Sequence, residues 1–132
     1  MFYIVLRDTL DAGQIAAQTA HVTSAFATEH PAVLGGWHTG EGSVVVLSAP
    51  GDALPRLRDE FARNDVPAAS FCEPDLGGAM TAVAVACERT HPLVRRHLRR
   101  LPLAGRPTGT HPGTPAGTSP SPLPPYPSGS GP

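Results

Sequence analysis

Short and almost wholly apolar segments constrain the fold of this chain more than any other feature of its sequence. Residues 2–6 read FYIVL and residues 43–49 read SVVVLSA. Runs of this length and apolarity are typical of central strands that are buried on both faces of a sheet. Two further strands are predicted at residues 67–72 (PAASFC) and 80–86 (MTAVAVA). The sequence therefore predicts a sheet of four strands.

Helices are predicted between these strands from capping residues and apolar periodicity. Asp11 and Gln14 have the spacing of a capping box, and the helix that they begin is expected to run to Glu29. Two further helices are expected to be capped by Asp52 and Thr90. The apolar side chains expected on the three helices are Ile15, Val22, Phe26, Leu54, Leu57, Phe61, Leu93, Val94, Leu98 and Leu101.

The order of elements and the lengths of their connections predict the topology. A strand, a helix and a second strand of these lengths form a right-handed parallel crossover. Only the segment EPDLGGA, residues 73–79, joins the third and fourth strands, and it is too short for a parallel crossover. This pair is therefore expected to be antiparallel. The predicted fold class is α/β, a three-layer α/β/α sandwich with a mixed four-stranded sheet.

The C-terminal segment differs in composition from the rest of the chain. Residues 106–132 are almost entirely Pro, Gly, Ser and Thr. Such a segment has too little apolar surface to offset the entropy of ordering its backbone, so a disordered tail is expected after a folded domain at residues 1–105. No signal sequence and no apolar run near the ~20 residues of a membrane span is found. We therefore expect a cytoplasmic protein without a membrane partner.

Charge is distributed unevenly along the chain. Residues 1–88 carry four Arg against eleven acidic residues, a local charge of −7, whereas residues 89–106 carry six Arg and no acid, a local charge of +6. Within the basic segment, two i, i+4 pairs are formed by Arg95, Arg96, Arg99 and Arg100. Cations suit the C-terminal end of a helix dipole, which is one interpretation. The other is a surface that contacts RNA phosphates.

Polar residues that could bind a substrate or take part in catalysis occur in two places. Gln14, Gln18 and His21 stand at i, i+4 and i+7, and are expected to share a helix face opposite the apolar stripe. They form either an ordinary solvated face or a surface that orients a substrate through amide hydrogen bonds. The loop at residues 73–78, EPDLGG, holds two acids that act either as turn formers or as a carboxylate that activates water. No Cys or His spacing indicates a metal site, and no cofactor is expected.

Taken in order, three blocks of sequence resemble the type II peptidyl-tRNA hydrolases. The first is IVLRDTLDAGQIAAQTAH at residues 4–21. The second, FCEPDLGGAMTAVAVA at residues 71–86, is similar to a bacterial and phage-associated branch with a Glu-Pro-Asp-Leu motif, as is RRLPLAG at residues 99–105. The resemblance covers residues 1 to about 105. It implies an α/β/α sandwich that hydrolyses the ester between a peptide and the terminal ribose of tRNA, without a cofactor.

The resemblance also implies a set of site residues. Gln14 stands where the family has a lysine, and Gln18, Asp75 and Thr81 match its Gln, Asp and Thr. His21 matches the His that follows the helix motif. The expected partner is peptidyl-tRNA, and a second copy of the chain in a homodimer is left open.

The position of the family lysine leaves a second function open. Gln14 replaces that lysine, and the chain contains no lysine at any position. Loss of a cation near an ester oxygen or a phosphate lowers transition-state stabilisation. The alternative to an esterase is a non-catalytic module of the same fold that binds tRNA ends, a nucleotide or a protein partner.

Overall fold

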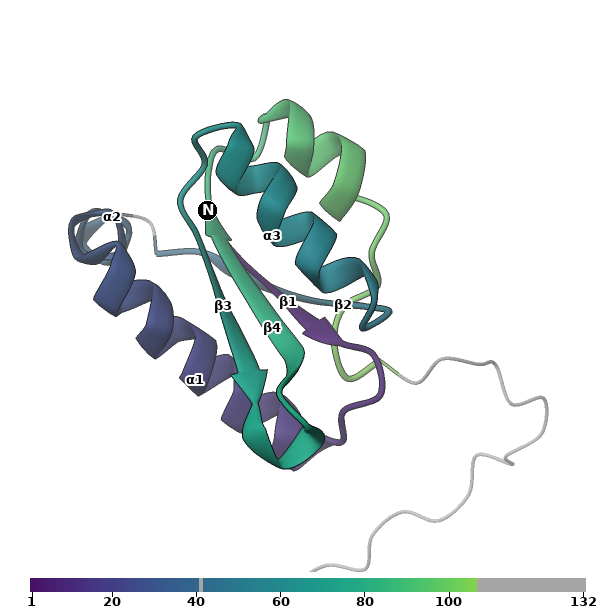
Figure 1. Cartoon of the computed structure of the whole chain (residues 1–132). Coiled ribbons are helices and arrows are strands. Elements are labelled where there is room, and N and C mark those ends of the chain that lie inside the picture. The colour runs from purple at the N-terminus through teal and green to yellow at the C-terminus, as the bar shows by residue number, and fades with distance from the viewer. Residues whose placement is uncertain (41, 107–132) are drawn as a thin grey trace, which may run out of the picture.

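The sheet has four strands, β1 (Phe2–Arg7), β2 (Val44–Ala49), β3 (Ala68–Glu73) and β4 (Ala79–Ala86). The computed structural model describes residues 1–40 and 42–106, and Figure 1 shows the strands in the order β2-β1-β4-β3. β1 pairs in parallel with β2, and β4 runs antiparallel to both β1 and β3. The predicted α/β class, the mixed four-stranded sheet and both strand pairings are confirmed.

Helices cover both faces of this sheet. α1 (Ala12–Glu29) and α2 (Pro31–Thr39) lie on one face, and α3 (Ala53–Arg63) and the short π-helical segment η2 (Val94–Leu98) lie on the other (Figure 1). α2 was not predicted. Two adjacent glycines lie in its middle, where glycine is unfavourable, and none of its residues is fully buried, although Leu34 and Trp37 pack against the core.

The helix caps agree with the sequence at one site and differ at two. The backbone N–H of Gln14 donates to Asp11 Oδ1 at 2.8 Å, and the Asp11 N–H donates to Gln14 Oε1 at 2.9 Å, which confirms the capping box. Asp52 makes no capping bond because the turn begins earlier and its backbone is already helical. At the third helix, Nδ1 of His91 accepts from the Leu93 N–H at 3.2 Å, so the predicted cap at Thr90 is wrong.

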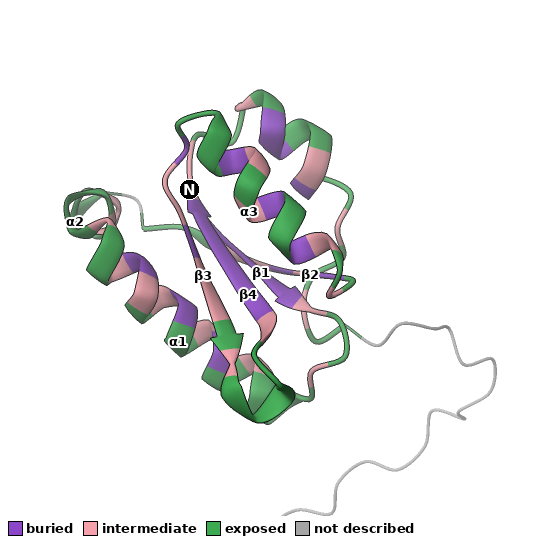
Figure 2. Ribbon diagram, in the orientation of Figure 1, coloured by how far each residue is buried: buried purple, intermediate pink, exposed green. Residues whose placement is uncertain are grey.

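Two apolar clusters, one on each face of the sheet, explain the apolar run in β1. Phe2, Ile4 and Leu6 pack with α1, whereas Tyr3 and Val5 pack with α3 and η2. Side chains alternate between the faces of a strand, so a strand covered on both sides must be apolar at every position. Figure 2 shows this strand buried between the helical layers.

The chain after η2 returns to the edge of the sheet beside β2. The Ser48 N–H donates to the Pro102 carbonyl at 2.9 Å, and the Ala104 N–H donates to the Val46 carbonyl at 3.0 Å. These bonds cover an edge that would otherwise expose unpaired backbone groups. The tail predicted at residues 106–132 lies outside the described residues, except for Arg106. Among the described helices, none has the length and apolarity that a membrane span requires.

Candidate functional site

A continuous chain of hydrogen bonds joins Thr81, Gln18 and Glu73, which we call the polar triad. The Thr81 hydroxyl donates to Gln18 Oε1 at 2.5 Å, and Gln18 Nε2 donates to Glu73 Oε2 at 2.6 Å. Thr81 is fully buried and Gln18 is 5% exposed, whereas Glu73 is half-buried. The triad therefore runs from the interior to the surface and ends on a carboxylate that solvent can reach.

A bulge in β4 brings Thr81 to this position. Phe71 pairs with Ala82 but Cys72 pairs with Met80, so Thr81 is the extra residue on its strand. Met80 packs on the α3 side of the sheet, and Ala82 packs on the α1 side. In a regular strand Thr81 would face α3, because successive side chains alternate. The bulge instead turns its hydroxyl toward α1, as bulges next to functional sites commonly do.

Gln18 lies on the buried face of α1, which corrects the sequence prediction. Its neighbours at i+4 and i+8 are Val22 and Phe26, and all three are buried against the sheet. The polar face predicted for Gln14, Gln18 and His21 therefore does not exist as one surface. A buried amide that is hydrogen-bonded through both its oxygen and its nitrogen costs little and fixes the position of its partners.

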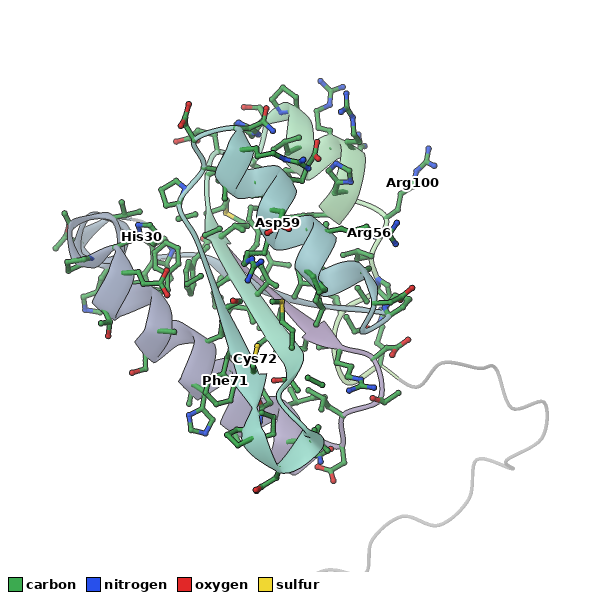
Figure 3. All side chains as sticks on the ribbon, in the orientation of Figure 1. His30, Arg56, Asp59, Phe71, Cys72 and Arg100 are labelled. Carbon is green, nitrogen blue, oxygen red and sulfur yellow. The ribbon has the colours of Figure 1, made fainter. Side chains whose placement is uncertain are left out.

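Gln14 and His21 lie on exposed parts of the same helix. The Gln14 side-chain oxygen is used by the capping box at Asp11. The His21 ring stacks on the Phe71 ring, with centroids 4.4 Å apart and planes 6° from parallel. Figure 3 shows Phe71 directed toward α1. Because the Phe71 carbonyl lies 3.5 Å from the Thr81 hydroxyl, this stacked pair adjoins the polar triad.

The acid that the structure places in the triad is Glu73, and sequence reasoning did not select it. Glu73 ends β3 two residues after Phe71 and faces α1 with it. Asp75, which the resemblance indicated, lies in the 3-10 turn η1 (Pro74–Leu76) and is exposed. Among the described residues it has no hydrogen-bond partner. Extending the predicted strand by one residue would have placed Glu73 on the helix-facing side.

The triad lies at the end of the sheet where β1 and β3 finish and β4 begins. Gly77 and Gly78, with φ of 66° and 76°, make the tight reversal that joins β3 to β4 at this end. The carboxyl ends of strands are the usual location of ligand sites in α/β folds. A carboxylate that an amide holds in place there can orient a water molecule and accept its proton.

The arginines of the C-terminal segment lie elsewhere. η2 follows the far end of β4 and packs Val94 and Leu98 against the α3 side of the sheet. Arg95, Arg96, Arg99 and Arg100 are all exposed, and within the described residues none forms an ion pair. Figure 1 shows this segment at the opposite end of the molecule from the β3–β4 turn. The structure thus brings Gln18 and Thr81 together with Glu73, but does not bring the arginines to them.

The composition of the site does not indicate a metal centre. Within residues 1–40 and 42–106, no three His, Cys, Asp or Glu side chains are grouped closely enough to hold a metal ion. The polar triad itself offers a carboxylate, an amide and a hydroxyl.

Comparison with solved structures shows a similar fold in a protein of unknown function from Agrobacterium tumefaciens. The TM-score is 0.57 at 16% sequence identity, and the match covers 77% of this chain and 95% of that chain. No model of a known protein family matches the chain, and no curated protein matches it. At this identity the likeness shows the fold alone.

Proposed function

We propose that the protein hydrolyses the ester bond of peptidyl-tRNA, releasing the peptide and free tRNA. The observation that carries the proposal is the polar triad. In it, Gln18 and Thr81, two of the residues that match the family, bond to each other, and Gln18 also bonds to Glu73. The contact between Thr81 and Gln18 depends on the bulge in β4 and on the packing of α1 against the sheet. A substrate of this kind belongs to the cytoplasm.

The triad supports a division of roles in this reaction. Glu73 accepts a proton from a water molecule as the water oxygen attacks the ester carbonyl carbon. The bond to the ribose oxygen then breaks, and that oxygen takes up the proton that Glu73 accepted, which restores the carboxylate. Gln18 holds the Glu73 carboxylate, and Thr81 fixes the orientation of the Gln18 amide. Asp75 and His21 are exposed beside the triad and are proposed to contact the substrate.

Release of the blocked amino acid from an N-acetylaminoacyl-tRNA by the purified protein tests this proposal directly. We expect turnover under conditions in which the ester alone is stable for the length of the assay. Absence of turnover by the folded protein, over a range of substrate lengths, would contradict the assignment of an esterase.

The arginine segment, which holds Arg95, Arg96, Arg99 and Arg100, is proposed to contact tRNA phosphates, and this contact can be tested separately. Replacing Arg96 and Arg100 by Gln should flatten the dependence of log affinity for tRNA on log salt by about one to two units, because each phosphate contact contributes about −0.7 to −0.9. Stability should be unchanged, since both side chains are exposed. An acceptor stem with its ester at Glu73 must pass an edge of the sheet to reach these arginines. Equal slopes for the wild type and the variant would remove them from the RNA contact.

A second candidate function is favoured by Gln14. At the position of the family lysine, this residue has no charge, and its side-chain oxygen is occupied by the capping box. A site without a cation can still bind a substrate, but it stabilises poorly the negative charge that develops on an ester oxygen during hydrolysis. The alternative is therefore a module of the same fold that binds tRNA ends, a nucleotide or a protein partner without turnover.

Replacing Gln14 by Lys distinguishes the two functions. In an esterase we expect the variant to hydrolyse the ester faster or to bind tRNA more tightly, since a cation then lies at the exposed first turn of α1. The loss of one capping bond and the cation at a helix N-terminus together should cost about 1 kcal/mol of stability. Hydrolysis rates and tRNA affinities of the two proteins measure the effect. A variant that binds and reacts like the wild type would show that this position is outside the site.

A further inference from the structure

A pocket of about 520 Å³ lies on the side of the sheet opposite the polar triad. Its walls come from β1, β2, η2 and the segment that returns to the β2 edge. The apolar part includes Tyr3, Leu47, Val94 and Leu98, each at most 5% exposed, and Leu103 stands at the edge of the pocket and is 48% exposed. A pocket of this volume is of the size that holds a small organic molecule.

The apolar part of the pocket is aliphatic, apart from Tyr3. Side chains such as Leu47, Val94 and Leu98 favour an aliphatic body over a planar base, which would need an aromatic face for stacking. Burial raises the pKa of the Tyr3 hydroxyl. The hydroxyl is protonated at neutral pH, as it is in a free tyrosine, and a protonated hydroxyl is a hydrogen-bond donor.

Three arginines surround this apolar surface. Arg89, Arg95 and Arg99 line the pocket, and all three are exposed. In the described part of the chain none of them has an acidic partner within ion-pair distance. Three cations of one sign at the same cavity repel each other, and a bound anion would relieve the repulsion. The planar guanidinium group matches a carboxylate through two parallel hydrogen bonds.

We propose that this pocket binds a small molecule with an aliphatic body and a carboxylate head group. The body lies on Leu47, Val94 and Leu98, and the carboxylate lies among Arg89, Arg95 and Arg99. Because the pocket combines an apolar surface with unpaired cations, it favours this ligand over a simple anion and over a neutral lipid. The pocket and the triad lie on opposite faces of the sheet, so the proposed ligand does not occupy the triad.

The arginine segment itself provides a matched control. Arg95 and Arg99 line the pocket, whereas Arg96 and Arg100 do not, although both pairs have the same spacing and charge. Figure 3 shows the Arg100 side chain extending away from the rest of the molecule. Two double variants, Arg95→Gln with Arg99→Gln and Arg96→Gln with Arg100→Gln, thus remove the same net charge and differ only in whether the pocket loses it.

Calorimetric titration of the full chain with decanoate tests the proposal. We expect saturable one-to-one binding that weakens about ten- to a hundred-fold in the Arg95/Arg99 variant and changes less than about twofold in the Arg96/Arg100 variant. Acetate, which lacks the aliphatic body, and decanol, which lacks the charge, should each bind at least ten-fold more weakly than decanoate.

Several outcomes would overturn this inference. Equal loss of decanoate affinity in both double variants would show that only the net charge attracts the ligand. Acetate or inorganic phosphate binding as tightly as decanoate would show a simple anion site. Absence of saturable decanoate binding to the wild type would exclude the ligand class. A Leu103→Asp variant adds a check, because a carboxylate at the pocket edge should weaken decanoate binding without removing an arginine.

Discussion

The Glu73→Gln variant is expected to lose about 10²–10⁴-fold of the ester hydrolysis rate while keeping its fold. The amide oxygen of the new Gln can still accept the hydrogen bond that Gln18 Nε2 donates to Glu73 in the structure. It cannot accept a proton from water, so only the base is removed. Release of the blocked amino acid from an N-acetylaminoacyl-tRNA measures the rate, and a thermal melt within a degree or two of the wild type shows that the fold is retained.

Two other acids serve as comparisons for this variant. Asp75→Asn changes the exposed acid that the resemblance indicated, and Asp59→Asn changes a carboxylate on α3, far from the triad, that pairs with Arg58. We expect full activity in the Asp59 variant. If Asp75→Asn lost the hydrolysis activity while the Glu73 variant stayed as active as the wild type, the base would be Asp75 and not Glu73.

The strands and the first helix could be predicted from the sequence because their signals are local. β1 is apolar at every position from Phe2 to Leu6, which only a strand covered on both faces requires, and the capping box at Asp11 marks the start of α1. The short connection at residues 73–79 allowed only an antiparallel pair. Each of these features depends on residues within one element or one turn.

The composition of the site could not be predicted in the same way, since it depends on contacts between distant segments. Gln18 was assigned to a polar face because glutamine is usually exposed. It is buried, and its hydrogen bonds are to Glu73 and Thr81, which lie 55 and 63 positions further along the chain. The bulge at Thr81 reverses the alternation of β4, and no residue type marks it. The distance of the arginine segment from the triad could not be predicted either, because it depends on the path of β4, which carries the segment to the opposite end of the molecule.

The buried polar groups of the triad lower the stability of the fold unless all of their hydrogen bonds are made. Removing one of these bonds is therefore expected to have a large effect on the free energy of unfolding. Thr81→Val keeps the shape of the side chain but leaves Gln18 Oε1 buried without the donor it has in the structure. An unsatisfied buried acceptor costs about 1–3 kcal/mol. For a domain of this size that corresponds to a fall in Tm of about 4–8 °C for each kcal/mol. Thermal or denaturant unfolding of the purified variant measures it.

Adding Gln18→Leu to Thr81→Val should restore most of the lost stability while leaving hydrolysis impaired. Replacing both partners of a buried hydrogen bond by apolar groups of similar shape is close to neutral, because no buried polar atom is left unpaired.

Glu73 is half-buried, so water can replace the bond that Gln18 supplied. We expect the free energy of unfolding of the double variant to lie within about 1 kcal/mol of the wild type. Its ester hydrolysis should still be at least about ten-fold slower, because no side chain fixes the position of the carboxylate. A double variant with wild-type activity would show that the triad only supports the fold. One whose destabilisation equals the sum of the two single changes would show that the bond between Thr81 and Gln18 contributes nothing of its own.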